Sequence, residues 1–436
     1  MKKKLTAAAA LLLAAALTVT CALAFTPADG AVETVENAAV AAAPGFTDDA
    51  ALLEGYLYRA NGLAVPEAVE QELTGDSASA PALNAVAMNA VTRKIYDAVV
   101  PYIIEIAAGN AATSVVRLDD PGITTSQLAG LDLNNLLHNL LANMPYELYW
   151  FDKTKGVASS YSYDGAGRVS YLALTFMVSQ DYAVVEGSSY YPDRPDTAKT
   201  GAATRAAAEA ANVVASNAAR SNYDKLTAYL AYIKAAVSYN SNAAYTSGYP
   251  YGDPWQLIYV FDGDPNTNVV CEGYSKAFKY LCDLTWQGAS PSVRCYLPTG
   301  TMNGGNHMWN IVSIGGANYL VDVTNCDAGT VGAPDKLFLC GASGSVSGGY
   351  SVSIPGQDAV AYAYDASTKS IYDTELELSA EAYTPAVYDM EYLRRLARHI
   401  ARIESMTAAA DLSKADVNGD GVVSAVDLTA LANLLA

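Results

Sequence analysis

The chain has 436 residues and a formal net charge of −19, with 45 acidic side chains against 26 basic ones. This acidic excess disfavours binding to nucleic acid and to anionic membranes, because both carry negative charge. Hydrophobic residues make up 51% of the chain, which is enough apolar material to form a folded core.

The first 24 residues have the pattern of a secretory signal peptide. Lys2-Lys3-Lys4 forms a basic start, residues 5–19 are apolar, and Ala22-Leu23-Ala24 is an A-x-A cleavage site. We therefore expect cleavage before Phe25 and a secreted, extracellular protein. No later segment approaches the roughly 20 apolar residues that a membrane helix needs, so we expect no membrane span.

The mature chain is predicted to contain four parts. They are a flexible lead-in at 25–47, an upstream helix-plus-strand subdomain at 48–195, a catalytic segment at 196–375 and a C-terminal module at 376–436. In the upstream subdomain, apolar spacing predicts helices at 87–107 and 131–141. Strands are predicted at 146–151, 161–163 and 169–178. Pro101 is expected to break or kink the first helix.

Three motifs in the catalytic segment supply a cysteine, a histidine and an aspartate in that order. They are Val270-Cys271-Glu272-Gly273-Tyr274, Asn306-His307-Met308-Trp309-Asn310 and Tyr319-Leu320-Val321-Asp322. These residue types are the parts of a thiol nucleophile, its base and the group that orients the base. The residues after Cys271 have helical apolar spacing, so the thiol lies at a helix start, where the dipole favours a thiolate.

The histidine and the aspartate are predicted to share one face of a hairpin. Residues 307–314 and 317–324 alternate like strands and are joined by Gly315-Gly316, a two-residue loop. The predicted cross-strand pairs at the open end are His307 with Thr324 and Trp309 with Asp322. His307 and Asp322 are then diagonal neighbours, roughly 7–8 Å apart between Cα atoms and within side-chain reach.

This layout resembles the transglutaminase-like superfamily, a papain-related group in which a helix carrying Cys packs on an antiparallel sheet carrying His and Asp. The resemblance covers residues 196–375. It implies that Cys271 is the nucleophile, that His307 is the general base and acid, and that Asp322 orients the imidazole. It also implies an α+β fold and acyl transfer on peptide or protein amide bonds, by a cysteine peptidase, an amidase or a transglutaminase, with no cofactor for catalysis.

An acyl-transfer site also needs hydrogen-bond donors for the oxyanion of its intermediate. The backbone N–H of Cys271 is one such donor. Gln256 and Trp255 are the candidates for the second, because both carry a side-chain N–H and lie shortly before the nucleophile. The alternative for Trp255 is that it only packs against a wall of the cleft.

Five cysteines remain after the signal peptide, an odd number that leaves at least one free thiol in a secreted protein. Cys271 is the natural free thiol. The other four are sufficient for two disulfides, whose pairing the sequence leaves open: Cys282, Cys295, Cys326 and Cys340.

A second motif lies near the C-terminus, where residues 416–427 have the spacing of a calcium-binding loop. Oxygen-bearing side chains occupy positions 1, 3, 5, 9 and 12, and Gly421 stands at position 6 for the sharp turn. The motif resembles a type I dockerin, the module that attaches secreted enzymes to cohesin domains of a scaffold protein. By this resemblance the calcium ligands are Asp416, Asn418, Asp420, Ser424 and Asp427, with the carbonyl of Val422.

A dockerin normally has two such loops, and here only one is intact. The helix of the first repeat begins at Asp389, but residues 378–389 lack a ligand pattern. We therefore expect one structural Ca²⁺, a small all-α module and a cohesin as partner, in a free or cell-surface cellulosome-like complex.

The alternative function is a non-catalytic peptide- or carbohydrate-binding component of such a complex. The chain has 31 tyrosines against 7 phenylalanines, and tyrosine suits wet clefts that hold peptides or sugars. Tyrosine equally suits a half-exposed β scaffold. No pair of carboxylates stands out in support of glycoside hydrolysis.

Overall fold

The computed structural model describes residues 32–33, 88–218, 220–243, 255–286, 292–372, 376–385, 390–402, 406, 414–417 and 423–435. Helices and strands come in runs along these residues, and the named strands pair antiparallel, as expected of an α+β chain. The predicted signal peptide lies outside the described residues, and so does the predicted lead-in apart from Val32–Glu33. Among the helices described, none is both long and apolar enough to cross a bilayer.

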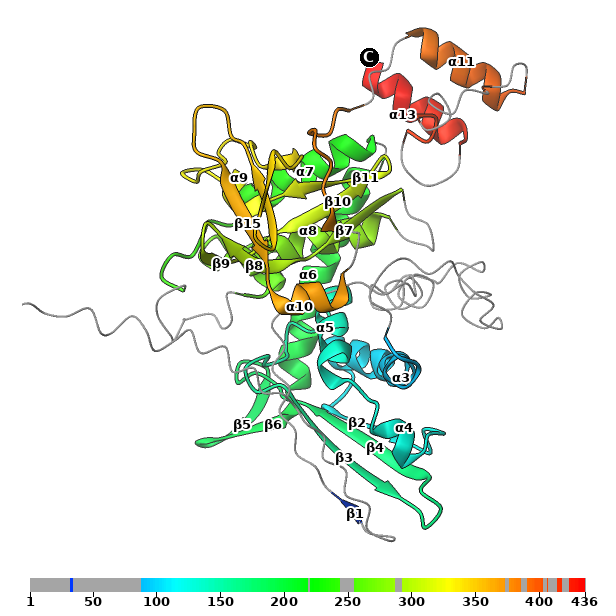
Figure 1. Ribbon diagram of the computed structural model, residues 1–436, viewed down its shortest axis with the longest axis vertical. Coiled ribbons are helices and arrows are strands. Elements are labelled where there is room, and N and C mark those ends of the chain that lie inside the picture. The colour runs from blue at the N-terminus through cyan, green and yellow to red at the C-terminus, as the bar shows by residue number, and fades with distance from the viewer. Residues whose placement is uncertain are drawn as a thin grey trace, which may run out of the picture.

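The chain before residue 196 builds a four-stranded sheet in the order β1-β3-β4-β2, with α3 packed on β2 and on α5 (Figure 1). Alternate residues of β3 are buried, which is the pattern of a strand with one face on a core. The elements of this part are β1 (Val32–Glu33), α3 (Ala90–Ala107), β2 (Val115–Asp119), α4 (Thr125–Leu128), α5 (Leu133–Asn143), β3 (Val157–Tyr163), β4 (Val169–Phe176), β5 (Ala183–Glu186) and β6 (Ser189–Pro195).

Two local predictions for this part are corrected: the helix does not break at Pro101, and residues 146–150 are not a strand. The helix α3 continues through Pro101 to Ala107, because its fully buried Ile95, Val99 and Ile103 hold it against the core on both sides of the proline. Residues 146–150 form turns rather than a strand. Their aromatic side chains are buried, and the Tyr149 hydroxyl lies within donating distance of Ala107 O at 2.8 Å and of Thr200 O at 2.9 Å, so burial there does not require strand alternation.

A layer of helices follows, and α8 lies at its centre. The helix contacts α6, α7, η1 and β7, and most of its residues are buried. Gly273 permits the close approach of the preceding chain, since a Cβ there would lie 2.6 Å from the Cβ of Val269. The elements are α6 (Thr197–Ser216), α7 (Asn222–Ala236), η1 (Leu257–Val260) and α8 (Cys271–Thr285).

Two further sheets cover α8, with strand orders β12-β11-β10-β7 and β13-β14-β15-β8-β9. The predicted hairpin is confirmed: Gly315 and Gly316 both have positive φ, and Ile314 pairs with Ala317. The elements are β7 (Val293–Tyr296), β8 (Thr299–Met302), β9 (Gly305–Met308), β10 (Asn310–Ile314), β11 (Ala317–Val321), α9 (Val323–Cys326), β12 (Phe338–Cys340), β13 (Gly344–Val346), β14 (Gly349–Val352), β15 (Val360–Tyr364) and α10 (Ala366–Ile371).

The C-terminal helices α11 (Met390–Ile400) and α13 (Ala425–Leu435) contact each other and stand apart from the remaining elements (Figure 1). They enclose a small hydrophobic core of their own, separate from the large core of residues 95–376. The core of this pair contains Tyr392, Leu396, Met406, Ala415, Val417, Ala430 and Leu431.

A buried cluster of charged groups joins α8 to the turns at 146–151. Lys279 is fully buried and donates to both carboxylate oxygens of Asp283, at 2.8 and 2.6 Å. Glu147 is only 2% exposed beside them. Burial, with a smaller contribution from Asp283, raises the pKa of Glu147 from 4.5 to about 7 despite the opposing charge of Lys279.

We predict that Glu147→Gln makes folding stability less sensitive to pH. The native state holds the Glu147 proton up to about pH 7, whereas the unfolded state releases it near pH 4.5. Wild-type stability therefore falls as pH rises through this window, by on the order of 3 kcal/mol from this group, and stays low above it. Urea unfolding at pH 5 and pH 8 measures the difference.

Glu105→Gln is the matched control, because Glu105 is exposed and the amide retains its hydrogen bond to Asn110. The control is expected to keep the wild-type pH dependence. An equal loss of stability between pH 5 and pH 8 in wild type and in Glu147→Gln would contradict the prediction.

Candidate active site

Cys271 is the first residue of α8 and is half-buried. The preceding Val270 is extended and provides no side-chain cap, so the first N–H groups of the helix are left to other acceptors. The thiol therefore lies at the positive end of a 15-residue helix. The predicted helix start is confirmed.

The strand that carries His307 differs from the prediction. β9 pairs with β8, where His307 lies opposite Gly300, and it belongs to a different sheet from β10. Trp309 separates the two strands, and its backbone N–H donates to Pro298 O at 3.2 Å. The predicted pairing of His307 with Thr324 was therefore wrong, because the chain changes sheets at Trp309.

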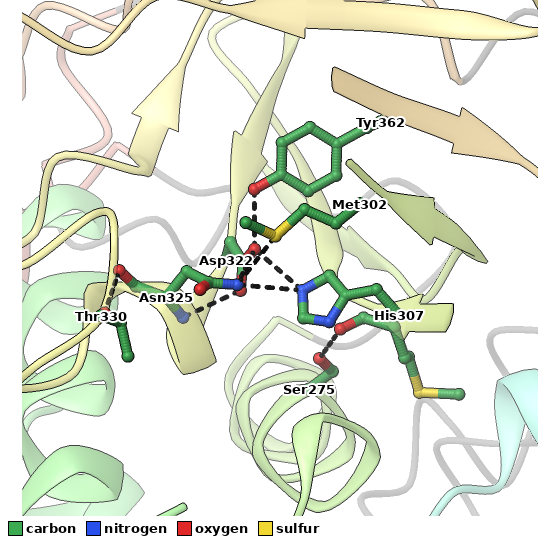
Figure 2. A network of polar contacts seen from close by, with 8 residues as sticks. Ser275, Met302, His307, Asp322, Asn325, Thr330 and Tyr362 are labelled. Carbon is green, nitrogen blue, oxygen red and sulfur yellow. Dashed lines mark hydrogen bonds and ion pairs between the residues drawn. The ribbon is translucent and has the colours of Figure 1, made fainter. Parts of the chain in front are cut away.

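Asp322 follows β11 directly and caps α9, which is why the hairpin ladder ends at Val321 instead of continuing to Thr324. Its Oδ1 accepts the N–H of Asn325 at 3.1 Å, the usual bond of a helix cap. Its Oδ2 accepts from the ring of His307 at 2.9 Å through Nε2 (Figure 2). The two side chains meet across a junction of two sheets and a short helix, not along one strand pair.

Two further donors reach the same Asp322 oxygen. The hydroxyl of Tyr362 donates to Oδ2 at 2.7 Å, and the amide of Asn325 donates at 2.8 Å (Figure 2). Sequence reasoning missed both residues. Asn325 lies three positions after Asp322 in a capping relationship that is visible in the sequence, but Tyr362 lies 40 positions away and carries no local signal.

Buried hydrogen bonds hold α8 against the strands beside His307. Ser275 Oγ donates to Met308 O at 2.9 Å, and Asn310 Nδ2 donates to Ser275 O at 3.0 Å. Ser275 is four residues after Cys271, one helical turn along the same side of α8. These bonds hold the first turn of α8 against β9, where His307 lies.

The imidazole of His307 carries a proton at neutral pH. Burial alone would lower its pKa, but the Asp322 carboxylate and a hydrogen bond with the Cys271 sulfur raise the pKa of His307 to about 10. Burial acts to raise the pKa of Asp322, yet contact with His307, Tyr362 and Asn325 lowers it below its ordinary value. With Nε2 directed at Asp322, Nδ1 is the ring nitrogen left for the thiol.

Aromatic rings enclose the back of the imidazole. Trp309 stacks on His307 with centroids 6.0 Å apart and an interplanar angle of 14°. Tyr362 lies 6.3 Å from the same ring, so the imidazole is confined between side chains that exclude water.

The predicted oxyanion candidates lie directly before η1, which packs on α8. Gln256 is buried, and its Oε1 accepts from Lys276 Nζ at 3.0 Å. Trp255 is half-buried in the same turn. The amide of Gln256 is therefore held in one orientation, with its N–H groups on the side away from Lys276.

Lys276 also forms an ion pair with Glu272 at 2.9 Å, and Lys153 from the upstream part of the chain contacts the other oxygen of Glu272. Burial acts to raise the pKa of Glu272, but the two lysines lower it to about 2. The residue next to Cys271 is thus an ionised, buried carboxylate between two cations.

All five described cysteines are free thiols, so the two disulfides that the sequence allowed are absent from these residues. Cys282, Cys295 and Cys326 are buried, and burial raises the pKa of Cys340 to about 11. Cys271 differs from all of them in its contact with a protonated imidazole.

Of the predicted calcium ligands, Asp416, Ser424 and Asp427 are described, whereas Asn418, Asp420 and Val422 lie outside the described residues. Asp427 is fully buried in the first turn of α13, and its Oδ2 accepts the N–H of Ser424 at 2.7 Å. A buried carboxylate in so small a core fits a cation site. Within the described residues alone, no group of three metal-binding side chains comes together.

Comparison with known proteins identifies the C-terminal region. Residues 392–436 match the dockerin type I domain, and this part of the chain is a dockerin type I domain. Such domains generally bind calcium and are characteristic of extracellular cellulosome components, so a cohesin is implied as partner. No curated protein matches the chain.

One solved structure, described as the crystal structure of a TGase, aligns with 17% sequence identity and a TM-score of 0.24. The alignment covers 40% of this chain and 46% of that chain, so it spans less than half of the solved protein.

We predict that iodoacetamide labels Cys271 faster than Cys340 at pH 6, because Cys271 is half-buried at a helix start and its sulfur contacts the imidazole of His307. The protonated His307 stabilises the thiolate, so His307→Ala is expected to slow labelling about tenfold or more. Mass spectrometry of the labelled peptides gives the rate for each cysteine.

Cys340 provides an internal reference in the same sample, because its raised pKa keeps it protonated at pH 6. Labelling of Cys271 that follows the pH dependence of an ordinary thiol, unchanged in His307→Ala, would contradict the prediction.

Proposed function

We propose that the chain is a secreted thiol-dependent acyl-transfer enzyme of the transglutaminase-like kind, acting on peptide or protein amide bonds and carried to a scaffold by its dockerin domain. The observation that supports this best is the contact of His307 with Asp322 at 2.9 Å on one side and with the Cys271 thiol on the other. A thiolate nucleophile, a protonated imidazole and an ionised orienting carboxylate are the groups that this chemistry requires.

In the proposed reaction the Cys271 sulfur attacks the amide carbonyl carbon, forming a C–S bond while the carbonyl oxygen takes the negative charge. The C–N bond then breaks, and His307 Nδ1 gives its proton to the leaving amine. The neutral imidazole next removes a proton from water or from a second amine, which attacks the thioester and releases Cys271. Asp322 keeps the ring in position throughout.

The oxyanion is proposed to accept hydrogen bonds from the Cys271 backbone N–H and from Gln256 or Trp255. Gln256 is the better supported of the two, because Lys276 holds its amide oxygen and so determines which way its N–H groups point. Trp255 remains a second candidate donor.

Hydrolysis is the proposed outcome in preference to transamidation. Transfer to an amine requires a site that keeps water from the thioester, and Cys271 is half-buried and accessible rather than enclosed. The expected substrates are therefore peptides or proteins, and the expected products are a carboxylate and an amine.

The C-terminal module is proposed to hold one structural calcium ion with Asp416, Asn418, Asp420, Ser424, Asp427 and the carbonyl of Val422. The ion supplies positive charge that offsets the loop carboxylates, including the fully buried Asp427. No part of the acyl-transfer proposal involves the ion.

We predict that the full chain cleaves amide bonds in a peptide library and that Cys271→Ala abolishes this cleavage. Asp322→Asn is expected to reduce turnover by roughly 10³- to 10⁴-fold, since it removes the charge that orients the imidazole. Mass spectrometry of the products, with and without an added fluorescent primary amine, separates hydrolysis from transfer.

Ser343→Ala serves as the control, because the exposed Ser343 lies far along the chain from the triad and bonds only to Ser351 O in the described contacts. If Cys271 labels as a thiolate but no amide substrate turns over, the enzyme proposal fails. A non-catalytic component delivered by the dockerin would then be the supported function.

We predict that one Ca²⁺ binds per chain and stabilises the α11–α13 pair. At a calcium concentration about 100 times its dissociation constant, the module gains roughly 2.7 kcal/mol. Asp427→Asn is expected to remove most of this gain, whereas Glu105→Gln leaves it unchanged. Calorimetric titration gives the stoichiometry, and equal calcium affinity in Asp427→Asn and wild type would contradict the assignment of Asp427.

A further inference from the structure

The Oδ2 atom of Asp322 accepts three hydrogen bonds, and the shortest comes from a residue outside the Cys-His-Asp motifs. Tyr362 donates at 2.7 Å, Asn325 at 2.8 Å and His307 at 2.9 Å. The carboxylate is completely buried, so these donors replace the water that would otherwise stabilise its charge.

Tyr362 reaches this oxygen from a different sheet. It lies in β15, between Tyr350 on β14 and Met302 on β8, and its side chain is fully buried. The ring stacks on Tyr350 with centroids 5.5 Å apart and lies 5.2 Å from Trp309. Packing on both sides leaves the hydroxyl a single direction, toward Asp322 (Figure 2).

We propose that Tyr362 is a positioning residue that sets how strongly Asp322 holds the Nε2 proton of His307. This inference rests on the proposed acyl-transfer function. A carboxylate oxygen that already accepts a hydroxyl proton carries less charge toward its other partners, so it competes less for the imidazolium proton. The imidazolium is then stabilised less, so His307 releases its Nδ1 proton to a leaving amine more readily.

Among the groups around Asp322, the hydroxyl of Tyr362 is the donor that can be removed without changing the charge nearby or the cap of α9. The titratable groups that face the carboxylate are His307, Tyr362, Tyr350 and Cys326. Tyr350 and Cys326 are neutral at physiological pH because burial raises the pKa of each. Asn325 is held by the α9 cap, so its donor is present whenever α9 is folded.

Tyr362→Phe in the full chain tests the proposal, since it deletes one buried oxygen and keeps the ring. Tyr350→Phe is the matched control: it deletes a hydroxyl from the stacked neighbour and leaves all three Asp322 donors in place. The primary measurement is the far-downfield proton resonance of the His307 Nε2–H, in protein with ¹⁵N-labelled histidine. The chain has three histidines, and loss of the signal in Asp322→Asn assigns it.

We expect the His307 resonance to move further downfield in Tyr362→Phe, because Asp322 becomes a stronger acceptor, and to stay in place in Tyr350→Phe. Amide turnover by Tyr362→Phe is expected to show kcat lowered about tenfold with KM nearly unchanged, the loss of one hydrogen bond to a charged group. Near-UV circular dichroism of both variants verifies that the aromatic cluster is folded.

An unchanged resonance in Tyr362→Phe would overturn the proposal, and so would an equal shift in both variants, which would assign the effect to ring packing. The resonance requires no substrate. Absence of turnover in the wild type would therefore refute the proposed function while leaving the Tyr362–Asp322–His307 coupling tested on its own.

Discussion

The buried carboxylate of Asp322 is the constraint on which the site depends. Its Oδ1 caps α9, and its Oδ2 accepts from the amide of Asn325 in that helix, from His307 on β9 and from Tyr362 on β15. A charge with no exposure to water is tolerated only with such donors, so the positions of β9, α9 and β15 are tied to one another. The same arrangement fixes the orientation of the imidazole, and although burial acts to lower the pKa of His307, the Asp322 carboxylate raises it.

Cys271, His307 and Asp322 are brought together by separate elements of the fold rather than by one pair of strands. The chain leaves one sheet at β9 and enters another at β10, and Trp309 lies at the change with its ring on His307. The Ser275 and Asn310 bonds then lock α8 against that junction. The start of α8, the change of sheet at Trp309 and the cap of α9 therefore bring the thiol, the imidazole and the carboxylate together.

The sequence predicted the features that depend on short stretches of the chain. The Gly315-Gly316 loop, the helix at Cys271 and the register of β10 with β11 followed from turn residues and periodicity. The end of the hairpin did not, because Trp309 leaves the ladder for a bond to Pro298, and strand alternation continues past that point in the sequence. Tyr362 was one tyrosine among 31, and only packing of β15 against β8 brings it to Asp322. Lys153 lies 119 positions from Glu272, and residue spacing cannot predict a contact over such a separation.

The contacts of Glu272 have a consequence for how such a protein can be rearranged over evolution. The α11–α13 pair has its own hydrophobic core, so its packing does not depend on the rest of the chain. The upstream part is not independent in the same way: Lys153 neutralises the carboxylate beside the nucleophile, and Tyr149 hydroxyl bonds span its helices and α6. Recombination at residue 196 would remove one of the two lysines that offset the buried Glu272 carboxylate one position from Cys271, and would leave only Lys276 to pair with it.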